Sequence, residues 1–361
     1  MRIAFFCSTP YQLLLATNIK IQLYKNDDAD IYVLNHFKNS SELVEKLKDS
    51  KLFKNVQHID CIEFTNSFSE NKGLRFIQKT VCYLKYKKIT KKYFELEDKF
   101  YDKVYFTYPD VIIQLAITEL FNKNSDMKIH LYEDGTGGYN TKILETSSYK
   151  KLFNKMFGFN RVIDRYDSIS IFMPEFYSSN IVIPLERLPK IDINNKELIR
   201  VINTIFDYQY DQVINEKIIF LEQPMDFING LNEEIKHIVE DILKENYIIK
   251  LHPRSNTELY ANFNVYKKNS IPWEIICLNN EIDDKVIISY FSTGGITNKI
   301  LFDKEPVVIF LFDLIELTPF HTVPDSTRNF IYRIRDTYRD QSRVIIPKDI
   351  NELREKLNAI N

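Results

Sequence analysis

Short apolar runs alternate with helical patterns along most of the chain, and this alternation narrows the available folds more than any other feature. Helices that connect successive strands imply a parallel sheet with both faces covered. The alternation weakens over residues 140–190 and then resumes. The strand-type runs lie at residues 2–7, 31–34, 56–59, 103–107, 128–132, 169–172, 217–221, 247–251, 285–289 and 307–310. The 361 residues are therefore predicted to form an α/β protein of two Rossmann-like domains, 1–188 and 189–361.

The patterns between these runs predict several helices and one connection. Ser8-Thr9-Pro10 is typical of a helix start, because a hydroxyl cap precedes a proline at the first helical position. Residues 74–94 predict one long helix and residues 147–156 a shorter one. The prolines at 174, 184 and 189 predict an extended link between the domains, centred on residues 185–192.

Composition excludes several classes of protein. A formal net charge of −2 gives no overall attraction for nucleic acid. The four cysteines show no paired spacing, which favours small buried side chains over disulfides. No apolar run reaches the roughly 18 residues of a membrane span, and the first run is too short for a signal peptide. We therefore expect a cytoplasmic protein.

The segment Tyr132-Glu133-Asp134-Gly135-Thr136-Gly137-Gly138 directly follows a predicted strand. The carboxyl edge of a parallel sheet is where open α/β folds bind ligands. Three of the chain's eight glycines fall in this segment, which indicates that its backbone geometry matters. Asp134 is therefore a candidate catalytic base. Two ordinary turns would explain the glycine clusters here and at 294–295 without any function.

Candidate donor-binding residues follow strands in the second half. Ser292-Thr293-Gly294 lies between a strand and a helix, where hydroxyls and free amides suit a phosphate, although a plain helix cap explains it too. His252-Pro253-Arg254 ends another strand, and a lone histidine is as readily structural. Trp273 and Glu274 open a helix, where Glu274 suits either ribose hydroxyls or simply the helix dipole. No set of His, Cys and carboxylates shows metal-ligand spacing.

Taken together, these motifs resemble those of the bacterial sialyltransferases of glycosyltransferase family 52, which make lipooligosaccharide and capsule. Cys7-Ser8-Thr9-Pro10-Tyr11-Gln12 is similar to the family's opening, and residues 133–137 resemble its Asp-Gly motif. His252-Pro253 resembles its His-Pro motif, and Ser292-Thr293 its hydroxyl pair, which the related family 80 shares. The order and separation of the motifs match, and the likeness spans nearly the whole chain.

The resemblance implies a GT-B fold, with the two domains facing each other across a cleft. It implies inverting, metal-independent transfer of sialic acid from CMP-sialic acid to a terminal galactose, most simply in α-2,3 linkage. Asp134 would take the proton from the acceptor hydroxyl, and His252 would relieve charge on the departing phosphate. Ser292 and Thr293 would bind that phosphate and Glu274 the ribose. Thr9, Pro10, Gly135, Thr136 and Gly137 would form the acceptor-side loops, with Pro253, Arg254, Trp273 and Gly294 on the donor side.

Alternatives remain open at this stage. A GT-B transferase of another nucleotide sugar would share the fold, and a non-catalytic glycan- or nucleotide-binding subunit of polysaccharide assembly would need the cleft but not the base. The resemblance also leaves open a homodimer and peripheral contact with the inner face of the cell membrane. Lys85, Lys87, Lys88, Lys91 and Lys92 are the candidate contact, although a solvated helix face explains them more simply.

Overall fold

The computed structural model describes residues 1–107, 110–135, 137–139, 152, 155, 165–178, 182–209, 213–223, 231–255, 257–314 and 323–360. It divides into two compact units. Unit 1 comprises Met1–Pro189 and Asn195–Asp207, and unit 2 comprises Lys190–Asn194 and Tyr208–Asn361. The predicted division at residue 188 and this one differ mainly in helix α8 (Lys196–Phe206), which belongs to unit 1 because it packs against α1 and α2.

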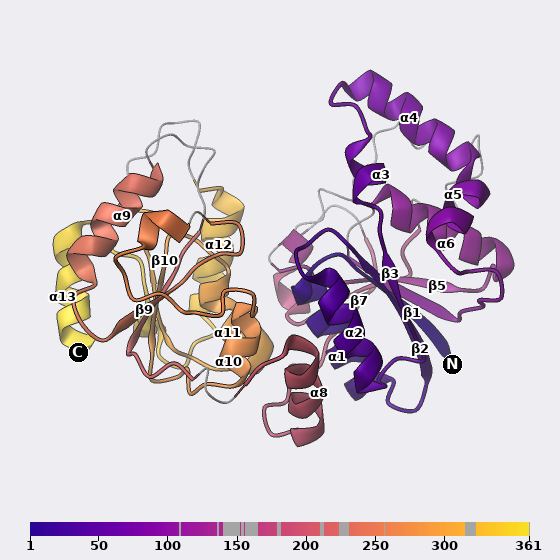
Figure 1. The fold of residues 1–361 in the computed structure, drawn as a ribbon. Coiled ribbons are helices and arrows are strands. Elements are labelled where there is room, and N and C mark those ends of the chain that lie inside the picture. Colours follow the sequence, from indigo (N-terminus) through magenta and orange to yellow (C-terminus); the bar gives the residue numbers. More distant parts are fainter. Residues whose placement is uncertain are drawn as a thin grey trace. The chain divides into compact units, whose positions relative to one another are not determined.

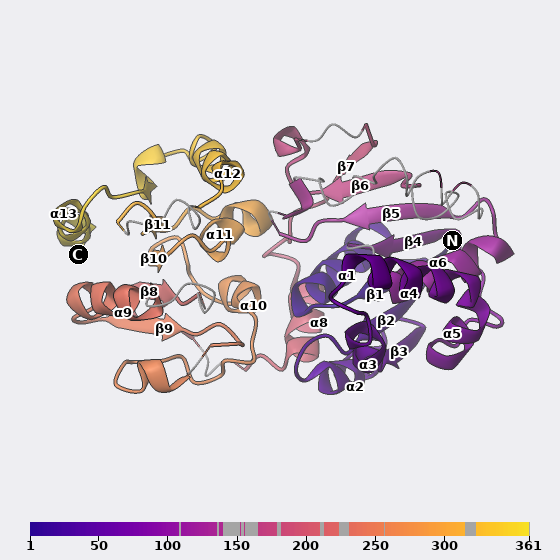
Figure 2. The same ribbon diagram turned by 90° about the horizontal axis from the view of Figure 1, so that it is seen from above.

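A seven-stranded parallel sheet forms the centre of unit 1. Its strand order is β3-β2-β1-β4-β5-β6-β7, which Figure 2 shows from one edge to the other. The inner strands β1, β2, β4, β5 and β6 are buried along most of their length, as expected for a parallel sheet covered on both faces, whereas the edge strands β3 and β7 are more exposed. Their bounds are β1 (Arg2–Cys7), β2 (Asp28–Leu34), β3 (Asn55–Ile59), β4 (Lys103–Phe106), β5 (Lys128–Tyr132), β6 (Ser168–Ile171) and β7 (Leu185–Arg187).

Helices cover both faces of this sheet. Helices α1 and α2 cover one face, where α8 also packs, and α5 and α6 cover the other (Figure 1), as expected when right-handed crossovers run in opposite directions from the sheet centre. The predicted start of α1 is confirmed, since the Thr9 hydroxyl accepts a hydrogen bond from the Gln12 amide at 3.2 Å ahead of Pro10. The other bounds are α1 (Pro10–Leu23), α2 (Ser40–Ser50), α3 (Ile62–Asn66), α4 (Lys72–Leu84), α5 (Tyr86–Tyr93) and α6 (Val111–Lys123).

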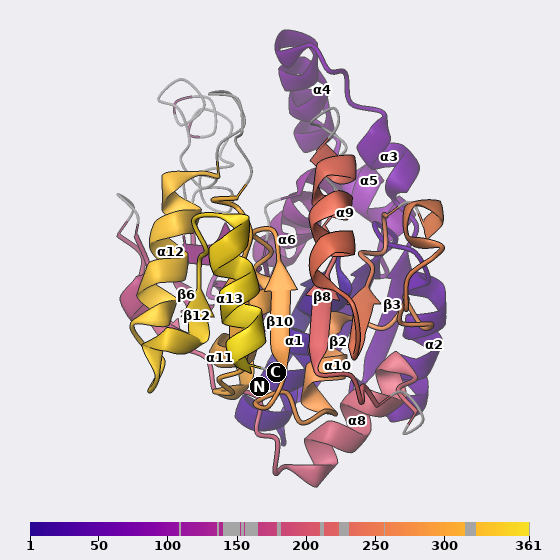
Figure 3. The ribbon, with the colours of Figure 1, turned by 90° about the vertical axis from the view of Figure 1, so that its left-hand side faces the viewer.

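Unit 2 has a five-stranded parallel sheet of order β12-β11-β10-β8-β9. Helix α13 lies beside α9 on one face, where the Arg354 guanidinium donates to Asp241 at 2.6 Å, and α10 and α11 lie on the other (Figure 3). The elements are β8 (Ile218–Leu221), α9 (Leu231–Ile242), β9 (Tyr247–Lys250), α10 (Trp273–Leu278), β10 (Val286–Ser289), α11 (Gly294–Phe302), β11 (Val307–Phe310), α12 (Asp325–Arg335), β12 (Val344–Ile345) and α13 (Ile350–Ile360).

Several local predictions were wrong. The helix expected over residues 74–94 is two helices, because the backbone leaves helical geometry at Lys85 (φ −103°, ψ 17°) before α5 packs along α6. The link expected near residues 185–192 contains β7, an exposed edge strand and therefore one without an apolar pattern. Elements α3, α12 and β12 are short or polar and were not predicted. The helix expected at 147–156 lies outside the described residues, apart from positions 152 and 155.

The described part of the chain contains no helix that is both long and apolar enough to cross a membrane. Cys7, Cys61 and Cys277 are free and buried, as the expectation of small buried side chains requires, and Cys82 is free and partly buried.

Candidate functional site

Asp134 stands in unit 1, two residues after the end of β5. Gly135 follows with φ +61°, a backbone conformation in which a side chain would be strained. The residue is exposed at the surface, yet neighbouring protein atoms desolvate its carboxylate and raise the pKa, against an opposing hydrogen bond with Gln12. Its accessibility allows an acceptor hydroxyl to reach it, and its raised pKa makes it a stronger base once ionised.

The loop between β1 and α1 meets the same edge of the sheet. The Gln12 side chain hydrogen-bonds with Asp134 and accepts a hydrogen bond from the Ser8 backbone amide at 2.6 Å. The Gln12 backbone amide donates to the Thr9 hydroxyl. The structure therefore brings the predicted Thr9-Pro10 turn and Asp134 together through one glutamine. Thr136 lies outside the described residues, and Gly137 is exposed in a short 3-10 turn.

Glu133, the residue before Asp134, has a buried and hydrogen-bonded carboxylate, a role that the sequence patterns did not predict. Its side chain is fully buried and accepts hydrogen bonds from Tyr139 (2.5 Å), the Phe172 amide (3.1 Å) and Tyr11 (3.2 Å). Burial outweighs these donors and raises the pKa of Glu133 to about 7. Glu133 therefore ties three separate segments to the strand end that carries Asp134. In the sequence, the sign of this role was that two acidic residues, Glu133 and Asp134, stand next to each other after a strand.

In unit 2, His252 follows β9 and is half-buried. Its Nδ1 accepts a hydrogen bond from the Arg254 amide at 3.2 Å, so a neutral ring carries its proton on Nε2. Desolvation lowers the pKa of His252, and the positive charges of Arg254 and Lys250 lower it further. The imidazole is therefore neutral near pH 7 and presents one N–H donor, which suits an anionic oxygen.

Glu222 holds the His252 loop in place, and sequence analysis gave it no role. Leu221 and Lys250 are paired in register at the ends of β8 and β9, so Glu222 lies level with Leu251, next to His252. The buried Glu222 carboxylate accepts the His252 amide at 3.0 Å and the Ser255 hydroxyl. In the sequence, the only sign that Glu222 has a role was its position at the end of a strand, just before Gln223-Pro224.

The residues after β10 form a compact turn into α11. The Ser292 hydroxyl accepts the Gly294 amide at 3.2 Å, and the Ser292 carbonyl accepts the Gly295 amide at 3.1 Å. The Trp273 indole donates to the Gly294 carbonyl at 2.8 Å. A Cβ on Gly294 would lie 3.1 Å from Leu221 and 3.3 Å from Trp273, so the backbone here packs tightly against both side chains. Two of the amides predicted to bind phosphate thus serve as a helix cap, while the two hydroxyls remain half-exposed.

Lys250 and Glu274 interact electrostatically in the same unit. The buried Lys250 ammonium donates to the side chain and carbonyl of Asn269 at 2.8 and 3.0 Å, and burial lowers its pKa to about 8. Desolvation raises the pKa of Glu274, and the nearby Lys250 opposes that shift. The Asn269 amide also donates to the His252 carbonyl at 3.3 Å. Lys250 and Asn269, which were not predicted, therefore connect His252 to the environment of Glu274.

The structure thus gathers the predicted residues into two groups, one at the carboxyl edge of each sheet. Asp134 belongs to unit 1 and His252 to unit 2, and their action on one substrate stays a prediction. Pro253 and Arg254 are exposed at the surface, where the Arg254 side chain is accessible to an anion. Within the described residues, no three His, Cys, Asp or Glu side chains form a metal-binding group.

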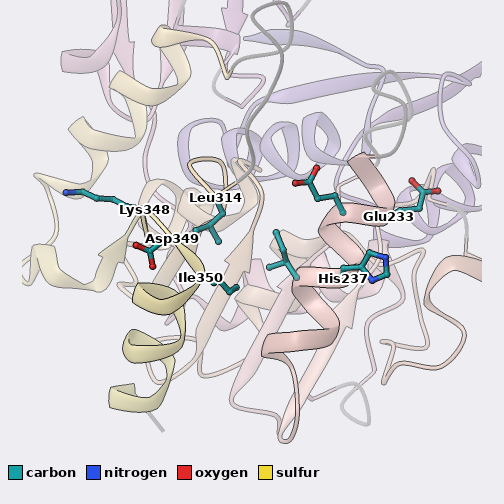
Figure 4. A pocket seen from close by; sticks show the side chains of 8 residues that line it. Glu233, His237, Leu314, Lys348, Asp349 and Ile350 are labelled. Atoms are coloured by element: carbon teal, nitrogen blue, oxygen red, sulfur yellow. The ribbon is translucent and has the colours of Figure 1, made fainter.

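An open groove of about 610 Å³ lies elsewhere in unit 2, between α9 and the start of α13. Figure 4 shows Glu233 and His237 projecting from α9 on one side, with Lys348, Asp349 and Ile350 opposite. Its remaining lining residues are Glu234, Ile238 and Leu314, and none of the predicted site residues is among them.

Two glycosyltransferases are among the solved structures with a similar fold. A kitacinnamycin glycotransferase matches 99% of this chain and 90% of its own, with 9% identity and a TM-score of 0.50. The spinosyn rhamnosyltransferase SpnG matches 100% of this chain and 91% of its own, with 8% identity and a TM-score of 0.52. With two parallel-stranded α/β units, these likenesses confirm the predicted GT-B fold. At such identities they establish the fold alone.

No curated protein sequence matches the chain. A family model does: that of the alpha-2,8-polysialyltransferases matches residues 3–310, a span that includes the loops of Asp134, His252 and Ser292. The resemblance to sialyltransferases is thereby confirmed at the level of glycosyl transfer, whereas assignment to family 52 itself stays a prediction. The protein therefore belongs to the alpha-2,8-polysialyltransferase family and is a glycosyltransferase with the GT-B fold.

Proposed function

We propose that this protein transfers sialic acid from CMP-sialic acid to a glycan acceptor, with inversion at the anomeric carbon and without a metal ion. The observation that carries the proposal is the family match over residues 3–310, which spans both groups of site residues. The bacterial origin and the assignment to family 52 belong to the same proposal. A location at the inner face of the cell membrane would fit an acceptor that is lipid-linked.

The chemistry needs a base on one side of the anomeric carbon and charge relief on the other. Asp134 is the accessible carboxylate for the first task, because its raised pKa suits proton abstraction from an acceptor hydroxyl. Its activity requires the ionised form, so the rate should fall as pH is lowered through that raised pKa. Positioned bases of this kind contribute about 10²–10⁴-fold to rate.

His252 serves the leaving CMP in this proposal. The neutral ring donates from Nε2 to a phosphate oxygen, and the developing negative charge raises its affinity for a second proton. The Ser292 hydroxyl hydrogen remains available to the same phosphate, since the serine oxygen acts as an acceptor in the helix cap. Such preorganised donors are often the largest contribution to catalysis. Glu274 is the proposed acceptor for ribose hydroxyls.

Two acceptors follow from different observations. The family description indicates a glycan that ends in sialic acid and is extended in α-2,8 linkage. The sequence motifs alone led to a terminal galactose in α-2,3 linkage. We propose the sialic acid acceptor as the first to test, because the family match covers residues 3–310 as one span, whereas the galactose acceptor rests on a few short, separated motifs.

The test is transfer from CMP-sialic acid to fluorescent oligosaccharides ending either in sialic acid or in galactose, with and without EDTA. We expect a product with one acceptor class, undiminished by EDTA. We expect Asp134→Asn to fold normally and to lose at least a hundredfold in turnover. Near-normal turnover in a folded Asp134→Asn protein would remove that residue from its role. Tighter binding of UDP than of CMP by calorimetry would favour another nucleotide sugar, and no product with any donor would favour the non-catalytic binding subunit.

A further inference from the structure

Helix α4 in unit 1 carries an apolar stripe that faces solvent. Leu74, Ile77, Val81 and Leu84 are 57%, 59%, 41% and 58% exposed. Their spacing of three, four and three residues places all four on one side of the helix. They account for four of the thirteen large apolar side chains exposed in the described part of the chain. Figures 1 and 3 show α4 projecting from the rest of the unit.

The opposite side of α4 already has a packing partner. Tyr83 is buried against Val111 and Leu115 of α6 and donates its hydroxyl to Gln114. Asn71 caps the helix by accepting the amides of Gly73 and Leu74, at 3.0 and 3.2 Å. The buried side of α4 and its capped start therefore anchor the helix, while the apolar stripe stays largely exposed.

The charge around this stripe has one sign. Residues 72–92 contain eight Lys and Arg and no Asp or Glu, giving +8 in a chain of net charge −2. Tyr86 and Ile89 of α5 pack against the same buried residues of α6 as Tyr83 does. The lysines on the other side of α5 are exposed: Lys87, Lys88 and Lys91. Opposing charges come from outside the segment: Glu97 pairs with Lys91 at 2.7 Å, Glu63 acts on Lys92, and Glu70 stands two residues before the segment in the sequence.

We propose that α4 and α5 form a docking surface for an anionic lipid bilayer, with the apolar stripe of α4 buried among the acyl chains and the lysines on the headgroups. An apolar stripe flanked by cations is the pattern of helices that lie in a membrane interface. Long cationic side chains extend to the headgroups while their stems cover apolar surface. A second copy of this chain is a poorer occupant, because two +8 segments would repel each other.

The surface lies near the catalytic edge of unit 1. Val111, which Tyr83 contacts, begins α6 just after β4, and β4 is paired in register with β5, the strand that leads to Asp134. A bilayer at α4 would therefore hold a lipid-linked glycan at the edge where Asp134 stands. This consequence rests on the proposed function, whereas binding to the bilayer does not.

The test is flotation with vesicles of phosphatidylcholine alone or with 30% phosphatidylglycerol. We expect binding to the anionic vesicles at least tenfold stronger than to the neutral ones, and weaker in 0.5 M salt. The double variant Ile77→Glu/Val81→Glu should lose at least tenfold in binding. Lys87→Ala/Lys88→Ala should lose about twenty-fivefold, at about fivefold per lysine near an anionic surface. The matched control Leu23→Glu/Val213→Glu changes exposed apolar residues elsewhere and should bind as the wild type does.

All variants should share the wild-type circular dichroism spectrum and turnover on a soluble acceptor, which separates this proposal from the proposed function. Equal binding to both vesicle types, no binding by the wild type, or full binding by Ile77→Glu/Val81→Glu would overturn it. Self-association in ultracentrifugation that disappears in Ile77→Glu/Val81→Glu would instead assign the stripe to a second copy.

Discussion

Glu133→Gln should change how the stability of this protein depends on pH. Glu133 is 0% exposed, and both oxygens accept hydrogen bonds: Oε2 from Tyr139 and the Phe172 amide, Oε1 from Tyr11. Glutamine preserves this pattern if its oxygen occupies the Oε2 position and its amide donates to the Tyr11 hydroxyl. The substitution therefore removes the ionisable proton and keeps the contacts.

The expected magnitude follows from the pKa. Burial raises the pKa of Glu133 from an ordinary 4.5 to about 7. A raised pKa means that the folded state holds the proton more tightly than the unfolded state does, so stability is fully present below pH 4.5 and falls as pH rises to about 7. At about 1.36 kcal/mol for each tenfold change in proton affinity, the full loss is about 3.4 kcal/mol. About 2.5 kcal/mol of it falls between pH 5 and pH 8.

The assay is urea unfolding followed by far-ultraviolet circular dichroism at pH 5, 6, 7 and 8. We expect Glu133→Gln to gain about 2.5 kcal/mol relative to wild type across this range, because only the wild type is forced to ionise a buried carboxyl. The comparison at each pH cancels the other titrating groups. If the two units unfold separately, the transition that the substitution shifts is the one to follow.

The control is Glu42→Gln, which makes the same change at an exposed position of α2 in the same unit. The Glu133→Gln difference from wild type should grow with pH by more than the Glu42→Gln difference does. A Glu133→Gln difference that grows no more than that of the control would refute the reasoning, since Glu133 would then titrate alike in folded and unfolded protein. A difference that shrinks as pH rises would show that the ionised form is the favoured one.

Three further outcomes follow from unit 2. Glu222→Ala should lower turnover by about ten- to a hundredfold in a folded protein, because the His252 loop loses its anchor, and Glu222→Gln should restore most of it; equal losses in both would argue against anchoring. The pKa of His252 followed by NMR should rise when CMP binds, and an unchanged value would leave the ring without phosphate contact. Gly295→Ala should destabilise unit 2 by about 1–3 kcal/mol, because its Cβ would lie 2.9 Å from Val308; an unchanged urea midpoint would contradict this.

Much of the fold was predictable from the sequence for a simple reason. Parallel strands are buried on both faces, so β1, β5 and β10 appear as short apolar runs between helical patterns. The same logic located Asp134 and Ser292 at strand ends, where acids, hydroxyls and glycines interrupt apolar sequence. The start of α1 at Thr9-Pro10 was equally local, because a cap involves only neighbouring residues.

Tertiary structure decided what depends on strand order and packing. Only the adjacency of β8 and β9 brings Glu222 within 3.0 Å of the His252 amide, 30 residues away. Only the packing of Tyr83 on α6 determines which side of α4 faces solvent, and so turns four ordinary apolar residues into an exposed stripe. Local patterns record whether a side chain prefers to be buried, whereas its partner is chosen by long-range pairing that no nearby residue specifies.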